Sequence, residues 1–279
     1  MFGFVSIFLM VFIFQTLISS SLKKLIFFLL AYAAIIVFLA VIAELEQPAY
    51  ITNTGYYFDF NYQLVALCFL ILCIFILPRV NFLSRFSIYF LGIPALYLIG
   101  ARSEFYAFFL LITIVEFYRT KASFLLISVV LFFGFLFLFL TDNFEFISGR
   151  MFNIFDGNDA SLSSRQILQK NAIMTISNNI LTGHYGSHPL GHYSHNILSL
   201  WVDMGLLGII IFCFSILLMV LNLHILKKTD KNSPLWLQAI SSSYLVIFML
   251  ALAKTYTYLL VPVAFASYCL LIMSRKQNL

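Results

Sequence analysis

Long apolar runs recur along most of this 279-residue chain, and they restrict its fold more than any single motif does. An α-helix needs about 20 apolar residues to cross the hydrocarbon core of a bilayer. Hydrophobic residues make up 62% of the chain and charged residues only 10%. Soluble domains contain about 45–50% apolar and roughly 25% charged residues. A soluble enzyme, a secreted disulfide scaffold and a disordered chain are therefore excluded, and we predict an all-α integral membrane protein.

Windows of that length predict a helical bundle of about nine membrane spans, forming a single membrane domain over residues 1–279. The candidate spans are Phe2–Leu17, Leu25–Ala43, Gln63–Leu77, Phe86–Ile99, Phe105–Phe117, Phe124–Leu140, Ile197–Leu221, Leu235–Ala253 and Tyr256–Met273. The fourth and fifth are short, and only Gly100–Glu104 separates them. We expect these two to form a tight helical hairpin.

The basic residues indicate the orientation of the spans, because cytoplasmic loops are enriched in Lys and Arg. The predicted spans place most of the 16 Lys and Arg residues on one side. They are Lys23, Lys24, Arg79, Arg85, Arg119, Lys121, Lys227, Lys228, Lys231, Arg275 and Lys276. The predicted topology therefore has the N-terminus outside and the C-terminus in the cytoplasm.

One outer segment, Thr141–His195, is much longer than the other loops and is rich in Ser, Asn, Gly and His. Loops longer than about 12–15 residues are usually functional or disordered. Within it, Ser164–Asn178 has a helix-like pattern, and the Ser161–Ser164 cluster is a candidate N-cap. We expect any chemistry to take place at this outer loop.

The pair His195-Asn196 stands where this loop meets the seventh span. The helix N-terminus disfavours imidazolium, and a neutral His can act as a general base. Asn196 can orient the imidazole or bind a substrate hydroxyl. The alternative is a structural histidine that caps the helix by hydrogen bonding.

Several outer basic residues suit an anionic substrate. Arg102 lies between two apolar spans, where an unpaired charge costs roughly 2.5–3.5 kcal/mol. It either binds substrate or pairs with Glu104 or a phospholipid. Arg165 and Lys170 add positive charge in the loop, and Arg150 is a rival to Arg165. Guanidinium groups bind phosphate bidentately, so these arginines predict a site for a lipid-linked pyrophosphate.

Other polar residues leave weaker alternatives open. His184, His188 and His192 are evenly spaced, but glycines and Pro189 interrupt the stretch, so a zinc site is the less favoured interpretation. The cysteines all fall inside apolar runs, which does not indicate a disulfide framework or a metal site. Asp203, within the seventh span, needs a partner inside the bundle. The candidate partners are Lys254, Tyr256 and Tyr258.

Four stretches in order, FDFNYQLVALCFL, GARSEFYAFFLLI, SSRQILQKNAIMTISNNILTGHYGS and HNILSLWVDMGLLGIIIF, resemble the O-antigen ligase/polymerase family of bacterial membrane glycosyltransferases. The resemblance runs from about Tyr56 to Ile211. The positions that match the family pattern are Asn61, Arg102, Arg165, Gly183 with Gly186, His195-Asn196, and Asp203 with Gly205. Ala101 replaces the serine that the family has before the turn arginine, and no proline precedes the glycine turn.

The resemblance implies an enzyme of the bacterial inner membrane whose active site faces the periplasm. Its donor and acceptor would be polyprenyl-pyrophosphate-linked oligosaccharides, used without a metal or other cofactor, and a chain-length regulator is a possible protein partner. Arg102 and Arg165 would hold the pyrophosphate, and His195 would deprotonate the acceptor hydroxyl. Asn61, Arg150, Lys170, Asn196 and Asp203 would bind substrate.

The single long outer loop favours a polysaccharide polymerase over a ligase that transfers glycan to lipid A-core. A lipid-linked oligosaccharide transporter is a second class, and it predicts two pseudo-symmetric halves, interrupted helices and charges at the midplane. A non-catalytic assembly partner is a third.

Overall fold

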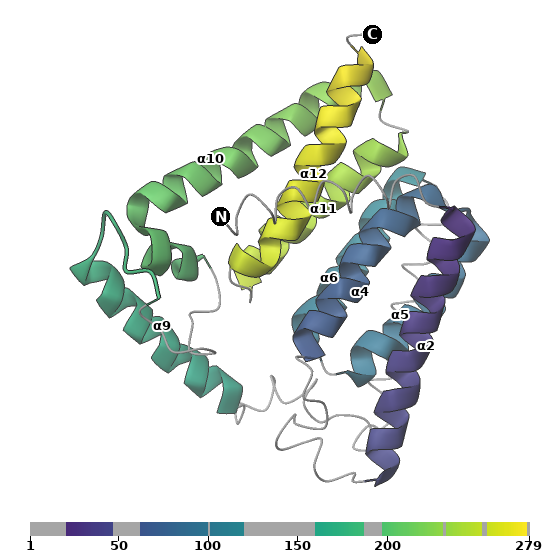
Figure 1. Cartoon of the computed structure of the whole chain (residues 1–279), viewed down its shortest axis with the longest axis horizontal. Helices are drawn as coiled ribbons and strands as arrows, with labels where there is room; N and C mark the ends of the chain where they lie inside the picture. The colour runs from purple at the N-terminus through teal and green to yellow at the C-terminus, as the bar shows by residue number, and fades with distance from the viewer. Residues whose placement is uncertain are drawn as a thin grey trace. The chain divides into compact units, whose positions relative to one another are not determined.

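The computed structural model describes residues 21–46, 62–99, 101–119, 160–186, 197–230, 233–252 and 256–277. Every regular element in those ranges is a helix, as the composition predicts. The chain divides into two compact units. We call them the N-terminal unit, which contains α2 to α6, and the C-terminal unit, which contains α9 to α12 (Figure 1).

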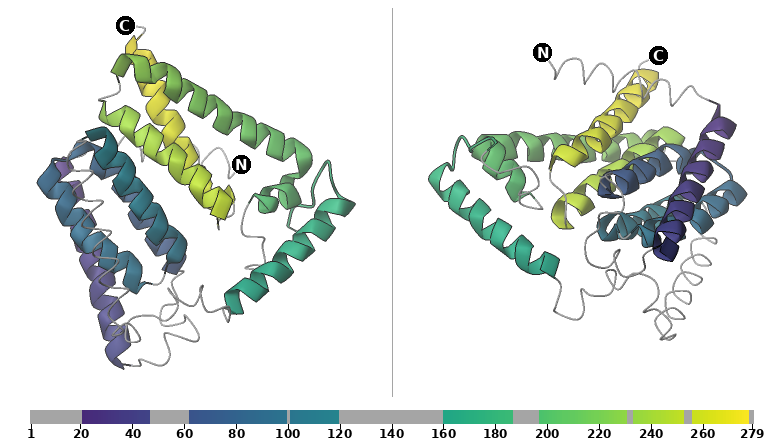
Figure 2. Two further views of the ribbon diagram at one scale, coloured as in Figure 1. Left: turned by 180° about the vertical axis from the view of Figure 1, so that it is seen from behind. Right: turned by 60° about the horizontal axis from the view of Figure 1, so that its bottom comes forward.

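The N-terminal unit is a bundle of long helices joined by tight links. Its elements are α2 (Leu22–Glu46), α4 (Tyr62–Ile76), the single 3-10 turn η1 (Leu77–Arg79), α5 (Phe82–Leu98) and α6 (Arg102–Arg119). Helix α2 packs against α4 and α5, and α6 packs against the same two helices (Figure 2). A three-residue link joins α5 to α6, which gives the hairpin that the short spans predict.

Aromatic packing around one glycine fixes the spacing within this unit. The rings of Phe69 in α4 and Phe108 in α6 are fully buried, with centroids 5.7 Å apart. A Cβ at Gly92 of α5 would lie 2.9 Å from both rings. A larger residue at this position would therefore push the three helices apart. The Tyr32 hydroxyl donates to the Val65 carbonyl at 3.1 Å and ties α2 to α4.

The C-terminal unit contains α9 (Ala160–Asn178), α10 (Leu198–Asp230), α11 (Pro234–Leu252) and α12 (Tyr256–Gln277). Helices α11 and α12 pack along each other, and α10 contacts all three of the others. Two side chains bond to backbone carbonyls across these contacts. The Trp236 indole donates to Leu223 at 3.2 Å, and the buried Ser242 hydroxyl donates to Pro262 at 3.0 Å.

Helix α10 is broken near its N-terminal end. Gly205 has φ 64° and ψ −168°, which is not helical. Figure 1 shows the result, a short segment that turns sharply into a long one. We call residues Leu198–Met204 the short segment and the rest of α10, from Leu206, the long segment.

Each candidate span that falls on described residues coincides with a helix, but several boundaries are wrong. Arg102 is the first residue of α6 instead of a turn residue, because the α5–α6 link is shorter than the five residues expected. Helix α10 continues beyond Leu221 to Asp230, since Leu223, Ile225 and Leu226 extend its apolar sequence. The spans expected over 2–17 and 124–140 lie outside the described residues.

The loop helix exists, but it begins earlier than its pattern predicts. Helix α9 starts at Ala160, so the Ser161–Ser164 cluster lies in its first turn instead of preceding it. Serine is tolerated there because the first amide groups of a helix have no partner within the helix.

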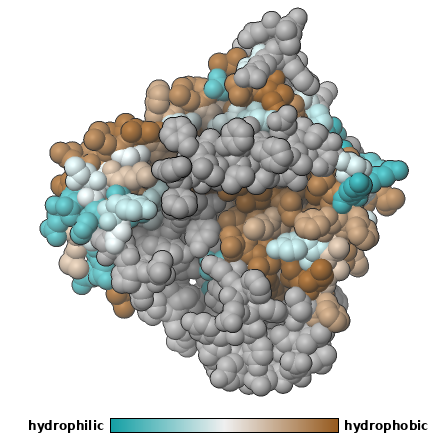
Figure 3. All heavy atoms as spheres, viewed as in Figure 1, coloured by the Kyte–Doolittle hydropathy of each residue, from teal (hydrophilic) through white to brown (hydrophobic). Residues whose placement is uncertain are grey.

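Among the described residues, two helices are long and apolar enough to cross a membrane. They differ in burial. In α11 the stretch Pro234–Ala251 is 67% buried, whereas in α10 only 11% of an 18-residue apolar window within Leu198–Ile225 is buried. Figure 3 shows hydrophobic side chains gathered on the surface over α10. Those that project most are Leu207, Ile211, Phe214 and Ile225, which are 57–66% exposed.

Candidate functional site

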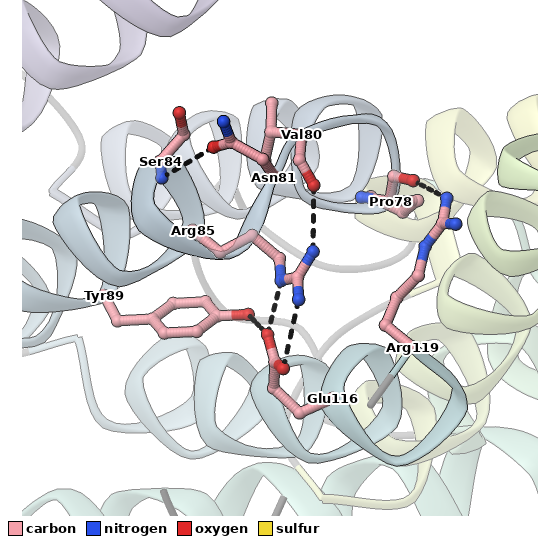
Figure 4. Close-up of polar contacts among 8 residues, drawn as sticks. All are labelled: Pro78, Val80, Asn81, Ser84, Arg85, Tyr89, Glu116 and Arg119. Atoms are coloured by element: carbon pink, nitrogen blue, oxygen red, sulfur yellow. Dashed lines mark hydrogen bonds and ion pairs between the residues drawn. The ribbon is translucent and has the colours of Figure 1, made fainter. Parts of the chain in front are cut away.

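Among the described residues of the N-terminal unit, a buried ion pair at one end forms a polar cluster with several hydrogen bonds (Figure 4). The Arg85 Nε and Nη2 atoms donate to the two carboxylate oxygens of Glu116, at 2.5 and 3.2 Å. The remaining Nη1 donates to the Val80 carbonyl at 2.8 Å, and the Tyr89 hydroxyl donates to Glu116 Oε1 at 2.8 Å. Arg85 is 4% and Glu116 0% exposed. We call these residues the arginine clamp.

The same end of the unit holds a second arginine. Arg119 Nη2 donates to the Pro78 carbonyl in η1. Burial and the neighbouring Arg85 lower the pKa of Arg119, and Glu116 opposes that change. The clamp and Arg119 thus join η1, α5 and α6 through bonds made entirely inside the protein. Because Glu116 is fully buried, this cluster offers its carboxylate to no ligand, and its role is structural.

The break in α10 creates a different arrangement in the C-terminal unit. In an unbroken helix the Leu206 amide would donate to the Val202 carbonyl. Here it donates instead to the Ile180 carbonyl at 2.9 Å, and Val202 accepts from the His184 amide at 2.6 Å. The turn after α9 therefore supplies new partners for both groups of this lost bond. We call the turn 180–186 together with residues 202–206 the glycine interlock.

Two glycines allow this close backbone contact. Gly183 and Gly205 both have positive φ, 67° and 64°. A Cβ on Gly183 would collide with the Gly205 amide nitrogen, and a Cβ on Gly205 would collide with the Leu181 carbonyl. Gly186 also has positive φ, 72°, but a Cβ there would meet nothing within 4 Å. Positions 183 and 205 thus require glycine for space as well as for conformation.

Packing between α9 and the short segment supports the interlock. Ala172 and Ile176 of α9 form a small buried cluster with Val202. The Trp201 indole nitrogen donates to the Ile180 carbonyl at 3.1 Å. Ile180 therefore accepts from both the backbone and a side chain of α10.

Asp203 lies at the break in α10, where its carboxylate accepts a hydrogen bond but is not fully buried. The buried Tyr256 hydroxyl, from α12, donates to its Oδ2 atom at 3.1 Å. Tyr256 is one of the three partners expected for Asp203, so that expectation is confirmed. Asp203 remains partly exposed.

The other expected site residues fall in three groups. Arg165 lies in α9, seven residues before Ala172 and so at nearly the same angular position on the helix, and Lys170 is exposed on α9. Arg102 belongs to the N-terminal unit, next to Ser103, whose hydroxyl donates to Glu104 at 2.7 Å. The remaining four, which are Asn61, Arg150, His195 and Asn196, lie outside the described residues.

The zinc alternative is not tested by this arrangement. No group of three His, Cys, Asp or Glu residues gathers within the described ranges. His188 and His192 lie outside those ranges, and His184 enters the interlock through its backbone amide.

The sequence does not predict the pairing of Gly183 with Gly205 or the hydrogen bond from Trp201 to Ile180. The available signal is that Gly183, Gly186, Asp203 and Gly205 all belong to the short stretches TGHYG and DMG. The structure brings those positions together in the interlock, through contacts about twenty residues apart in the chain.

Comparisons of the chain with protein-family models, with curated proteins and with solved structures find no match.

Proposed function

We propose that this protein is a multi-pass membrane glycosyltransferase that polymerises polyprenyl-pyrophosphate-linked repeat units into O-antigen or capsular polysaccharide. It would act at the periplasmic face of a bacterial inner membrane. The observation that carries the proposal is the glycine interlock. It joins two of the stretches that resemble the O-antigen ligase/polymerase family, TGHYG and DMG, at one end of an apolar helix.

Exposure of α10 supports residence in a membrane. A soluble monomer rarely exposes an apolar patch larger than a few hundred Å². A helix with an 18-residue apolar window that is only 11% buried needs lipid or other protein around it. The topology that we propose has about nine spans with the N-terminus outside and the C-terminus in the cytoplasm. It places the interlock at the outer end of α10.

The break in α10 also suits a site. Irregular backbone at membrane depth is tolerated where protein or a water-filled cavity surrounds it, and here the turn satisfies the freed groups. Asp203 keeps a partly exposed carboxylate at this break. The peptide His195-Asn196 lies immediately before the short segment in the sequence.

In the proposed reaction an acceptor hydroxyl oxygen attacks the anomeric carbon of the donor, with inversion. The bond from that carbon to the pyrophosphate oxygen breaks, and the pyrophosphate leaves with the electron pair. His195 takes the hydroxyl proton, while Arg102 and Arg165 stabilise the charge on the leaving group. Asn61, Arg150, Asn196 and Asp203 bind the two glycans and the pyrophosphate. Neutralisation by arginine replaces a metal ion.

The test is electrophoresis of surface polysaccharide from a deletion strain that carries wild-type or variant genes. A polymerase deletion leaves lipid-core with a single repeat unit, and the wild-type gene restores the ladder. We expect His195→Ala to abolish the ladder, and Arg165→Lys to weaken it because the charge stays but the bidentate fork is lost. Lys23→Ala, on the cytoplasmic side, is the matched control.

Two outcomes would contradict the assignment. Free polymer that accumulates on its lipid carrier, with no repeat on lipid A-core, would identify a ligase. A ladder that survives His195→Ala at wild-type protein level would remove the general base from the mechanism. Purified protein should also polymerise equally well with and without a metal chelator.

A lipid-linked oligosaccharide transporter is the second candidate, because α10 is interrupted as that class predicts. The break lies near one end of the helix, whereas transporter breaks lie near the midplane. A transporter deletion would leave undecorated lipid-core and trap the repeat unit on the cytoplasmic side. The lipid-core carrying one repeat therefore separates the two functions.

A further inference from the structure

Helix α9 carries an apolar surface that its packing against α10 does not use. Ala172 and Ile176 face the short segment. On the opposite side, Ile167 is 62% and Met174 54% exposed, and Ile173 beside them is 53% exposed. A helix that only separated the protein from water would need one apolar face. Helix α9 has a second group of exposed apolar side chains, and the polar Gln166 and Ser177 lie among them.

A cation stands within this second face. Lys170 is exposed and lies three residues after Ile167 and four before Met174, so the three share one side of the helix. The whole segment 160–186 contains no Asp or Glu, while it contains Arg165, Lys170 and His184. Its charge is thus complementary to an anionic surface.

The apolar surface continues through the turn toward α10. Ile180 is 50% and Leu181 63% exposed, and the Ile180 carbonyl bonds to the amide of Leu206. Leu207, the next residue of the long segment, is 63% exposed. Figures 1 and 2 show that α9 diverges from the long segment and meets only the short one. Helix α9 is therefore not packed along the apolar helix that we propose to span the bilayer.

We propose that the face of α9 formed by Ile167, Lys170, Ile173 and Met174 lies in the outer leaflet of the membrane and binds anionic phospholipid headgroups. The apolar side chains enter the boundary between headgroups and acyl chains, and Lys170 extends to the phosphates. This inference rests on the proposed membrane location of α10 and not on the proposed reaction. It gives α9 a second role, which is to fix the height of the interlock relative to the lipid carrier.

The test places a fluorophore on each side of α9 in the full-length protein. Native Cys68, Cys73, Cys213 and Cys269 are replaced by alanine, and a single cysteine is introduced as Met174→Cys or Gln169→Cys. Both positions are exposed, and they lie about 140° apart around the helix. The labelled proteins are reconstituted in vesicles of phosphatidylcholine and phosphatidylglycerol, three to one. Quenching is measured with a shallow nitroxide lipid and with aqueous iodide.

We expect the nitroxide lipid to quench position 174 roughly threefold more than position 169, and iodide to do the reverse. Lys170→Glu, or vesicles of phosphatidylcholine alone, should reduce the lipid quenching at 174 by about half. If lipid quenching at position 174 is unchanged by Lys170→Glu and by the loss of phosphatidylglycerol, anionic headgroups have no role and that part of the proposal is overturned. Quenching by iodide alone at both positions would overturn the inference.

A variant that keeps only the native Cys213 separates this inference from the proposed function. Cys213 is exposed on the long segment of α10 and should be quenched by a deep nitroxide lipid. If Cys213 is quenched and position 174 is not, only the α9 inference is wrong. If Cys213 is not quenched, the membrane proposal itself fails. Self-quenching between labelled copies at 174, without lipid quenching, would identify a second copy as the occupant and contradict the proposal.

Discussion

The arginine clamp and the glycine interlock both place a carboxylate between helices, but they leave different amounts of it available. Glu116 is fully buried and accepts from two nitrogens of Arg85 and from the Tyr89 hydroxyl. Asp203 is partly exposed and receives the Tyr256 hydroxyl on one oxygen. In the arginine clamp, the carboxylate is fixed by hydrogen bonds from two other side chains. In the glycine interlock, backbone hydrogen bonds join the turn after α9 to the broken helix α10.

The extent to which a carboxylate is paired and buried can separate structural from functional polar residues in an apolar chain. A buried charge must be paired, and a fully paired one marks an anchor. A partly exposed acid beside a break in a helix is a stronger candidate for binding, because part of its carboxylate stays accessible to a ligand. The two clusters should therefore respond differently to substitution.

The largest expected effect is in the arginine clamp. Glu116→Gln removes the charge that pairs with Arg85 and leaves a buried guanidinium without it. We expect a loss of about 3–5 kcal/mol in the free energy of unfolding, measured by thermal or denaturant unfolding in detergent. Activity should fall in proportion to the folded fraction only.

The matched control removes both charges. Arg85→Met with Glu116→Leu should be less destabilised than Glu116→Gln, since no uncompensated charge stays buried. If the single substitution changes stability by less than about 0.5 kcal/mol, the anchor interpretation is wrong.

The next effect is in the interlock. Gly205→Ala puts a Cβ against the Leu181 carbonyl at a residue with positive φ. We expect at least about 2–3 kcal/mol of destabilisation, together with faster hydrogen exchange at the amides of His184 and Leu206.

Gly186→Ala is the control for conformation alone, because φ is positive there but nothing lies within 4 Å of the added carbon. It should destabilise the protein by roughly 1–2 kcal/mol. Equal effects at the two glycines would show that the close backbone contact is not what fixes Gly205.

The smallest stability effect is at the Asp203–Tyr256 bond. Tyr256→Phe removes one hydrogen bond and should lower stability by about 1 kcal/mol. Asp203→Asn keeps the shape of the side chain and should reduce polymer formation far more than it reduces stability. If the Asp203→Asn protein keeps full polymerase activity, the Asp203 carboxylate has a structural role like that of Glu116 and does not bind substrate.

The sequence predicts the helices well, because apolar windows depend on composition alone. It does not predict the break in α10, since one glycine hardly alters the mean hydropathy of a 33-residue helix. The interlock also depends on contacts between Ile180–His184 and Val202–Leu206, and these are set by tertiary packing that no periodicity encodes.

The charge pattern shows a similar limit. Arg85 counts as a cytoplasmic cation in the orientation argument, yet it is buried and paired with a residue 31 positions away. The positive-inside bias depends on the number of Lys and Arg residues near the ends of the spans during membrane insertion, so it does not report which of them later form ion pairs. For Asp203, in contrast to Arg85, the sequence does predict the partner. An acid within an apolar span needs a partner nearby, and Tyr256 at the start of the last helix is one of the candidates.

The most direct test of the central claim is polymerisation by purified protein in vesicles that contain radiolabelled, polyprenyl-pyrophosphate-linked repeat units. We predict that wild-type protein converts them into a ladder of longer lipid-linked glycans. Folded His195→Ala and Arg165→Ala proteins should produce no ladder. A ladder of unchanged length and rate from both variants, or none from the wild type with donor and acceptor present, would contradict the account.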